Sequence, residues 1–221
     1  MSPPSFKRLP RHVGVIPDGN RRWAEERGMS REEGYAFGIP VGFQMAETCI
    51  DLGIEELSYY GFTQDNTKRP AAQTRAFQQA VVRAVHMLQT RNLDLLICGN
   101  SDSPMFPQEL LPFTRRTRFG KGGIKLNLLV NYSWQWDLAQ VCRNVPSNPS
   151  ADIETAIGSA QISRMDLVIR WGGRRRLSGF LPIQTVYADF YVVDAYWPDY
   201  SDQQLYDALA WYETQDVTLG G

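Results

Sequence analysis

The chain has 221 residues, of which 43% are hydrophobic and 21% are charged, a balance that excludes an intrinsically disordered protein. This length suits one globular domain with a core of its own. The formal net charge of −1 provides no overall positive field, so we expect no nucleic-acid partner, and any anion site must come from local clusters of arginine.

No apolar run approaches the roughly 18 residues of a membrane span, and the basic first eleven residues lack the apolar core of a signal peptide. Three widely spaced cysteines, Cys49, Cys98 and Cys142, lack metal-ligand spacing and are expected to be buried thiols in a reducing compartment. We therefore expect a cytoplasmic protein without a membrane span.

Short, β-branched apolar runs recur along the chain, and runs of this length predict strands that are buried on both faces. They span residues 12–16, 57–62, 93–98, 124–130, 166–169 and 190–193. Alternation of such strands with helices predicts an α/β protein. We expect a single domain over residues 1–221, with a mostly parallel six-stranded sheet flanked by helices.

Three helices are predicted between and after these strands. One begins near Arg22, and one covers residues 71–89, where apolar side chains recur at helical spacing and Pro70 suits the first position. The third covers residues 205–212, with Ser201 as its N-cap. Residues 144–150, rich in Asn, Pro and Ser, predict a linker.

The turn after the first strand carries the first candidate site. Asp18 follows the strand, Gly19 permits a ligand to approach the main chain, and Arg21 and Arg22 stand where a helix begins. In open α/β sheets, ligands gather outside the carboxyl ends of strands. Asp18 is suited to a hard cation such as Mg²⁺, and the arginines to an anion. The alternative is an ordinary capped turn with solvated arginines.

A second strand-to-helix turn, residues 62–70, is also rich in hydrogen-bonding groups, among them Thr63 and Asn66. Its alternative interpretation is again a capped turn. A third turn follows the strand at residues 166–169, where Arg170 and the run Arg174-Arg175-Arg176 flank two glycines. Four arginines within seven residues predict an anion site, and the alternative is a solvated basic loop.

A fourth segment places Asp189 and Asp194 on either side of apolar residues. Each is a candidate metal ligand, helix or turn cap, or buried hydrogen-bond acceptor, and spacing alone leaves these alternatives open.

Three motifs occur in order along the chain: Asp18-Gly-Asn-x-Arg-Trp-Ala, Arg176-x-Ser178-x-Phe180 and Trp197-Pro-Asp-Tyr. Over roughly residues 12–200 the chain resembles the cis-prenyltransferase family, typified by undecaprenyl diphosphate synthase. The resemblance implies an α/β enzyme that joins allylic diphosphates and releases pyrophosphate. It also implies Mg²⁺ as cofactor and a homodimer.

The resemblance implies roles for individual residues. Asp18, Asn66 and Arg69 match catalytic positions, and Asp18 and Asp189 match metal-contacting carboxylates, the second near the dimer interface. The matching substrate-binding positions, from the donor's diphosphate site to the acceptor's, are Gly19, Asn20, Arg21, Arg22, Trp23, Arg31, Tyr35, Thr63, Arg170, Arg176 and Ser178.

Departures from the family pattern cluster at the same positions. They are Pro17 for a methionine, Arg21 for a glycine, Tyr35 for a histidine, Thr67 for a tryptophan, Trp171 for a small residue and Asp189 for a glutamate. With these substitutions the chain resembles members that couple two molecules of dimethylallyl diphosphate head-to-middle and close a ring. We expect the shorter Asp189 and the bulky Trp171, beside Arg170, to shift the acceptor.

Three alternatives stay open. In the first, the chain is a regular short-chain synthase that uses isopentenyl diphosphate. In the second, it is a non-catalytic partner subunit that supports an active chain. The third is an anion- or RNA-binding module using the run Arg174–Arg176, although the aromatic stacking pattern expected for RNA is missing.

Overall fold

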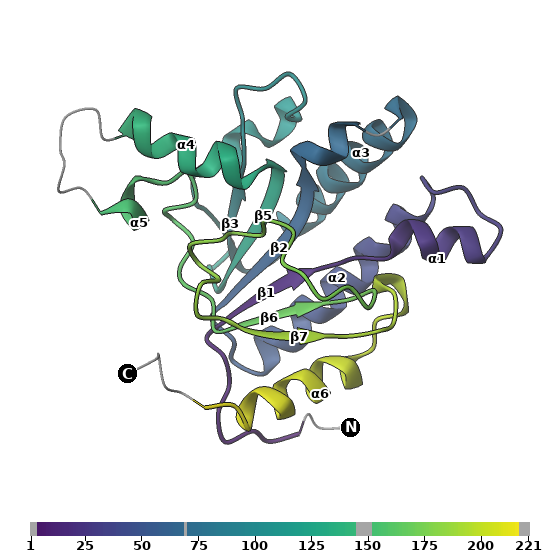
Figure 1. Ribbon diagram of the computed structural model, residues 1–221, viewed down its shortest axis with the longest axis vertical. Coiled ribbons are helices and arrows are strands. Elements are labelled where there is room, and N and C mark those ends of the chain that lie inside the picture. The colour runs from purple at the N-terminus through teal and green to yellow at the C-terminus, as the bar shows by residue number, and fades with distance from the viewer. Residues whose placement is uncertain (1–3, 69, 145–151, 217–221) are drawn as a thin grey trace.

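The computed structural model describes residues 4–68, 70–144 and 152–216, and its centre is one seven-stranded sheet (Figure 1). The strands are β1 (His12–Ile16), β2 (Glu56–Thr63), β3 (Leu93–Cys98), β4 (Thr117–Phe119), β5 (Ile124–Tyr132), β6 (Leu167–Arg170) and β7 (Asp189–Val192). Their order across the sheet is β4-β3-β5-β2-β1-β6-β7. Every neighbouring pair is parallel except β3 and β4.

The six predicted strands are all present, but the prediction of a six-stranded sheet is wrong by one. The additional strand, β4, has three residues and pairs antiparallel with β3 at the edge of the sheet, with Phe119 opposite Leu93. So short a segment, with the exposed Arg118 at its centre, has no apolar run from which a strand can be predicted.

The helices are α1 (Asn20–Glu26), α2 (Gly34–Asp51), α3 (Ala71–Leu88), α4 (Trp134–Asn144), α5 (Ile153–Ala156) and α6 (Asp202–Glu213). Three short 3₁₀ helices are η1 (Gln64–Lys68), η2 (Gln108–Phe113) and η3 (Trp197–Asp199). The three predicted helices correspond to α1, α3 and α6. Ser201 is the N-cap of α6, and its N–H donates to the side chain of Gln204 at 3.3 Å.

Helix α2 was not predicted, because three glycines and a proline weaken its helical pattern. The glycines stand four residues apart and allow close packing. A Cβ on Gly34 would lie 2.2 Å from the carbonyl oxygen of Asn20, and one on Gly38 would lie 2.9 Å from Cδ1 of Trp197. Tertiary packing thus keeps a helix where intrinsic propensity opposes it.

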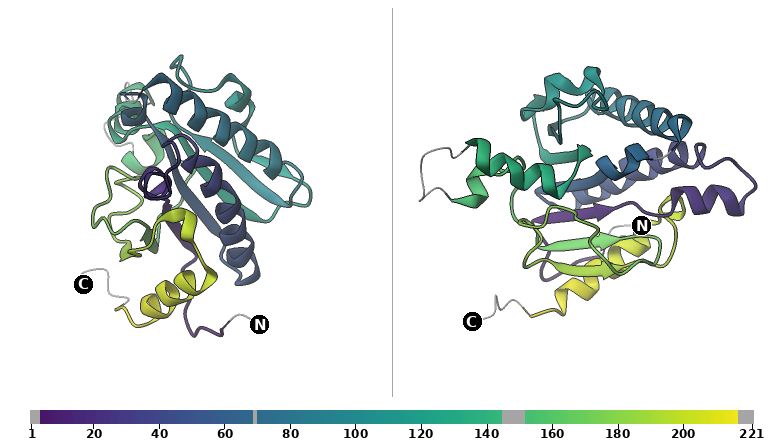
Figure 2. Two further views of the ribbon diagram at one scale, coloured as in Figure 1. Left: turned by 90° about the vertical axis from the view of Figure 1, so that its right-hand side faces the viewer. Right: turned by 45° about the horizontal axis from the view of Figure 1, so that its top comes forward.

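Alternate residues of each central strand enter two different cores. Val13 and Val15 of β1, with Leu167 and Ile169 of β6, pack against α2, α3 and α6. Figure 2 shows α2 and α3 running side by side along that face. Val168 of β6 belongs to the opposite core, which residues 162–181 help to build.

The predictions for the cysteines, the linker and a membrane span have different outcomes. Cys49 and Cys98 are buried, whereas Cys142 is exposed, so the expectation of buried thiols is correct for two of three. The predicted linker at residues 144–150 lies outside the described residues, except for Asn144, which ends α4. Across the described ranges, no helix has the length and apolar character needed to cross a bilayer.

Candidate active site

The carboxyl end of β1 passes directly into the first predicted turn. Gly19 has φ +106°, a left-handed conformation that disfavours a side chain, and its N–H donates to Oδ1 of Asp18 at 2.7 Å. Helix α1 begins at the next residue, Asn20. The turn therefore holds the Asp18 carboxylate at the tip of the strand.

The third predicted turn lies beside the first because β6 pairs with β1, with Arg170 opposite Ile16. The Arg170 side chain is only 6% exposed. Its guanidinium donates to Oδ2 of Asp18 at 2.8 Å, to Oγ of Ser178 at 3.0 Å and to the carbonyl oxygen of Arg176. One buried arginine thus joins the two turns.

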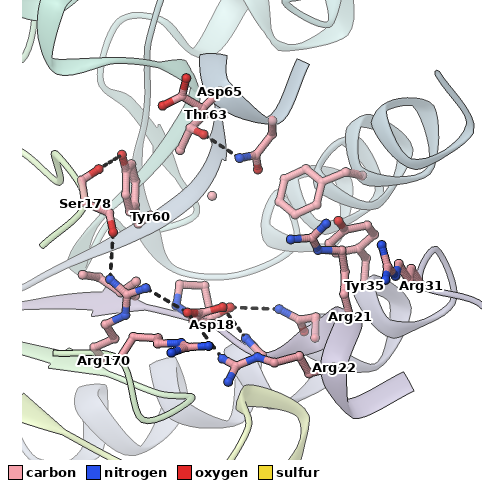
Figure 3. Close-up of a pocket in the computed structure, with 18 of the residues that line it drawn as sticks. Asp18, Arg21, Arg22, Arg31, Tyr35, Tyr60, Thr63, Asp65, Arg170 and Ser178 are labelled. Atoms are coloured by element: carbon pink, nitrogen blue, oxygen red, sulfur yellow. Dashed lines mark hydrogen bonds and ion pairs between the residues drawn. The ribbon is translucent and has the colours of Figure 1, made fainter. Parts of the chain in front are cut away.

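These turns border a cavity of about 550 Å³ at the carboxyl end of the sheet (Figure 3). In Figure 3, Arg170, Ser178 and Tyr60 stand on one side of Asp18, and Arg21, Arg31 and Tyr35 stand on the other. The charged residues that line the cavity are six arginines and three carboxylates: Arg21, Arg22, Arg31, Arg170, Arg174, Arg176, Asp18, Glu25 and Asp65. The excess of positive charge suits a ligand with several phosphate groups.

A third wall comes from the end of β2 and from α3. The amide of Asn66 donates to Oγ1 of Thr63 at 2.6 Å, and both residues line the cavity. The rings of Tyr35 and Phe77 meet edge to face at 4.7 Å, and Phe77 stacks on Phe62 at 5.4 Å. This aromatic wall makes one side of the charged cavity apolar.

A second, smaller cavity of about 120 Å³ lies between α2, α3 and the sheet. Pro17 lines both cavities. Apart from Pro17 the smaller one is lined by mostly apolar residues: Gly38, Ile39, Gly42, Phe43, Ala46, Tyr59, Ala84, Leu88, Leu126, Leu128 and Trp197. It offers room for a short hydrocarbon group next to the charged cavity.

Twelve of the predicted site residues are brought together. Those that line the large cavity are Asp18, Gly19, Asn20, Arg21, Arg22, Arg31, Tyr35, Thr63, Asn66, Arg170, Arg176 and Ser178. Arg69 lies outside the described residues.

Two tryptophans occupy places that differ from the expectation. Trp23 is buried outside the cavity lining, and its indole N–H donates to Oδ1 of Asp199 at 2.6 Å. Trp171 is fully buried, donates to Oε1 of Gln204 at 2.9 Å and packs edge-on against Trp197 at 4.9 Å. The side chain of Trp171 enters the core beside Trp197 and does not line the large cavity, so it can shift the acceptor only indirectly.

Asp189 does not reach Asp18 within one chain. It begins β7 and pairs with Leu167, whereas Arg170 pairs with Val192. At about 3.3 Å per residue, Asp189 lies roughly 10 Å before the carboxyl end of the sheet. Burial raises the pKa of Asp189, an effect that the charge of Arg8 partly offsets. A metal ion shared by Asp18 and Asp189 stays a prediction for an assembly of two chains only.

The sequence did not single out Tyr60, which lines the cavity beside Ser178. Its hydroxyl donates to the carbonyl oxygen of Ser178 at 2.8 Å, and its ring packs against Phe180 at 5.0 Å. Burial raises the pKa of Tyr60 to about 12, with a smaller contribution from Asp65, so the phenol is neutral at ordinary pH. The period-two pattern of β2 was the available signal, because Tyr60 and Ser58 share one face of the strand.

The donor set at Asp18 fits Mg²⁺, which proteins commonly hold through one or two carboxylates together with phosphate oxygens. The Asp18 side chain is 34% exposed at the cavity. Within residues 4–68, 70–144 and 152–216, no cluster of three or more His, Cys, Asp or Glu side chains could hold a metal by itself. The ligand's phosphates would therefore have to supply most of the coordination.

Comparisons with known proteins identify relatives of this chain. A family model described as "Putative undecaprenyl diphosphate synthase" matches residues 16–220. The ditrans,polycis-undecaprenyl-diphosphate synthase ((2E,6E)-farnesyl-diphosphate specific) of Aliivibrio fischeri is 30% identical, over 96% of this chain and 89% of its own. The enzyme of the same name from Pseudomonas putida is 31% identical, over 96% and 91%.

Among solved structures, lavandulyl diphosphate synthase from Lavandula x intermedia, in complex with dimethylallyl diphosphate, superposes with a TM-score of 0.83. The match covers 96% of this chain and 99% of the other, at 24% sequence identity. The two chains therefore share a fold.

Proposed function

This chain belongs to the cis-prenyltransferase family typified by undecaprenyl diphosphate synthase, and from that premise we propose that it joins two molecules of dimethylallyl diphosphate. As a family member it is a prenyltransferase with cis-prenyl diphosphate synthase activity. The coupling we propose is head-to-middle, followed by ring closure to a ten-carbon diphosphate of the cyclolavandulyl type. The proposal includes Mg²⁺ as cofactor and a homodimer as the active assembly.

One observation carries the proposal: two arginine-bearing turns face the same cavity, and a small, mostly apolar cavity adjoins it. Gly19, Arg21, Arg22 and Arg31 line one side of the cavity and would hold the diphosphate of the donor. Arg170, Arg176 and Ser178 line the other side and would hold that of the acceptor. Two short substrates with one diphosphate each match this division.

The volume of the small cavity supports a short product. The small cavity measures about 120 Å³, less than the engineered cavity of about 150 Å³ that binds benzene. That volume suits a five-carbon group but not a long polyprenyl chain. The plant enzyme of the same fold, solved in complex with dimethylallyl diphosphate, supports this choice of substrate.

In the proposed reaction, the C1–O bond of the donor breaks and its diphosphate leaves with the bonding electrons. Arg21, Arg22 and the main-chain N–H groups of the first turn would stabilise the charge that develops on this leaving group. Asp18 would hold Mg²⁺, which when bound neutralises further negative charge there. C2 of the acceptor then bonds to C1 of the donor through the electron pair of its double bond, which leaves a tertiary cation on C3 of the acceptor. A proton moves from a methyl group of that cation to the remaining double bond of the donor unit. The new alkene closes the ring on the resulting cation, and loss of one proton gives the product.

The aromatic wall has a role in the same sequence. Tyr35 and Phe77 exclude water from the allylic cation, and the ring of Tyr60 offers an electron-rich face on the side of the acceptor. Because the phenol of Tyr60 is neutral and its hydroxyl already donates to Ser178, we assign it no part in removing the proton.

The test is to incubate the purified protein with Mg²⁺ and dimethylallyl diphosphate alone, and to identify the dephosphorylated product by mass spectrometry and NMR. We expect pyrophosphate release and a branched or cyclic ten-carbon alcohol. A parallel incubation that adds isopentenyl diphosphate examines the alternative. If turnover requires isopentenyl diphosphate and the product is linear, the chain is a regular short-chain synthase. Absence of turnover in both incubations would favour a non-catalytic partner subunit.

A further inference from the structure

A segment after β7 lies directly behind the turn that we assign to the donor's diphosphate. We refer to residues 195–199 as the brace. The N–H of Trp197 donates to the carbonyl oxygen of Asp18 at 3.0 Å, and the N–H of Gly172 donates to that of Ala195 at 2.8 Å. At the far end of the brace, Asp199 accepts the indole hydrogen bond of Trp23. The brace therefore contacts the donor turn at Asp18, the acceptor turn at Gly172 and helix α1 at Trp23.

Tyr196 makes the fourth and least expected contact. Its ring lies against Gly19 so closely that a Cβ there would be 2.6 Å from Cδ1 of the tyrosine. The guanidinium carbon of Arg22 stands 4.9 Å from the centre of the same ring. The hydroxyl donates to Oε1 of Glu26, one turn further along α1, at 2.5 Å. Tyr196 thus spans the turn and the first two turns of α1.

Arg22 needs such support because its side chain is 35% exposed. Its guanidinium donates to the carbonyl oxygen of Gly172 at 2.9 Å and lies 3.6 Å from Oδ2 of Asp18. These contacts fix one end of the Arg22 guanidinium, and the Tyr196 ring packs against its planar face. Without the ring, Arg22 would have more rotamers available and would lose more freedom on binding an anion.

We propose that Tyr196 is a positioning residue for the diphosphate of the donor, acting through Arg22. This inference rests on the proposed role of Arg22 at the donor site. Tyr196 is not among the residues that line the cavity, so its effect on the diphosphate would pass through Arg22. The Arg22 cation lies over the Tyr196 ring at a partly exposed site. We therefore expect removal of the ring to lower the affinity for an anion by about 3- to 10-fold.

The experiment measures binding of inorganic pyrophosphate to the whole protein by titration calorimetry in the presence of Mg²⁺. Tyr196→Leu removes the ring, and Tyr196→Phe keeps it while losing only the hydroxyl. We expect pyrophosphate affinity to fall about 3- to 10-fold in the leucine variant and to stay within about 2-fold of wild type in the phenylalanine variant.

The matched control is Tyr187, another tyrosine under an arginine but away from the cavity. The guanidinium carbon of Arg164 lies 4.2 Å from its ring centre. Tyr187→Leu should leave pyrophosphate affinity unchanged. Thermal unfolding shows whether each variant is folded, and if Tyr196→Leu is not, Tyr196→Met serves as the second ringless variant.

A double mutant separates action through Arg22 from a general effect on the fold. In an Arg22→Ala background, Tyr196→Leu should cause no further loss of pyrophosphate affinity. An equal loss in both backgrounds would overturn the inference, because Tyr196 would then act without Arg22. If Arg22→Ala alone changes nothing, the proposed donor role of Arg22 fails, and a persisting effect of Tyr196→Leu belongs to Gly19. Unchanged affinity in the leucine and methionine variants would also overturn the inference.

Discussion

The Asp18 carboxylate and the Arg170 guanidinium form a direct ion pair at 2.8 Å, although they belong to turns that we assign to different substrates. Arg22 approaches the same carboxylate oxygen at 3.6 Å. The proposed metal ligand is therefore paired with two arginines. A diphosphate that draws Arg170 away would at the same time release Asp18, which couples acceptor binding to metal binding.

The first prediction concerns metal affinity without substrate. Arg170→Gln should increase the affinity of the substrate-free protein for Mg²⁺ by about 10-fold, because a charge-assisted hydrogen bond no longer competes for Asp18. Titration calorimetry with Mg²⁺ measures this affinity. Arg174→Gln is the control, since Arg174 lines the same cavity while no ion pair joins it to Asp18 within the described ranges. Equal Mg²⁺ affinity in wild type and Arg170→Gln would mean that Asp18 is not the metal ligand.

The second prediction concerns Asp18 itself. Asp18→Asn should reduce kcat by at least about 100-fold, because charge on the leaving diphosphate loses its metal-mediated stabilisation. It should also destabilise the fold by about 1–2 kcal/mol, or roughly 2–8 °C in Tm, since the nearly buried Arg170 loses a partner that is itself partly exposed. Steady-state kinetics and thermal unfolding measure the two effects. Near-normal kcat at saturating Mg²⁺ would exclude the assigned role.

The third prediction concerns the acceptor turn. Arg176→Ala should raise KM by about 10- to 150-fold, the effect of losing one charge-assisted contact to a diphosphate. Ser178→Gly should cost less, because it removes a hydroxyl but relieves a residue held at φ +54°. Kinetics over a range of substrate concentrations provide the comparison. An unaltered KM in both variants would remove this turn from the site.

The fourth prediction concerns stability and pH. His12 is 1% exposed, and burial lowers its pKa below the ordinary 6.5, although the charges of Glu56 and Asp166 oppose the shift. The unfolded chain therefore takes up this proton before the native protein does, and stability falls as the pH drops below about 6.5. Denaturant unfolding between pH 8 and pH 5 should show that fall.

The control for this prediction is the other histidine. His12→Gln should flatten the slope of unfolding free energy against pH over this window, whereas His86→Gln, on the exposed side of α3, should keep it. Glu56 also has a lowered pKa, since the His12 charge and hydrogen bonds from Ser163 and Asn127 outweigh its burial. Protonation of Glu56 lowers the stability only below about pH 4.5, outside the range from pH 8 to pH 5 that is measured. Equal slopes in wild type and His12→Gln would contradict the assignment.

Local patterns predicted the parts of the site but not their assembly. Each strand tip followed by Gly and Arg was visible in the sequence, because those residue types are set by the backbone and charge at one turn. The ion pair of Asp18 with Arg170 could not be predicted, since it depends on β1 lying beside β6, and local patterns carry no record of such pairing. Trp171 was misplaced although period-two alternation sends it to the face opposite Arg170.

Helix α2 is an element that its local sequence pattern does not predict. Its glycines lower helical propensity, but the packing of Trp197 and Asn20 against them and the burial of Met45 and Cys49 in the core stabilise the helix. Trp23 was assigned to the substrate because its motif surrounds the site, but consecutive helix positions point about 100° apart, and Trp23 turns away from the cavity that Arg22 faces.

The order of strands also has a consequence for synthesis of the protein on the ribosome. β1 is made first, yet its outer neighbour, β6, is complete only when residue 170 has been added. Until then a growing chain would present the apolar β1 as an open edge, which other chains could extend. Translation that stops before β6 should therefore yield an inactive product with a tendency to aggregate.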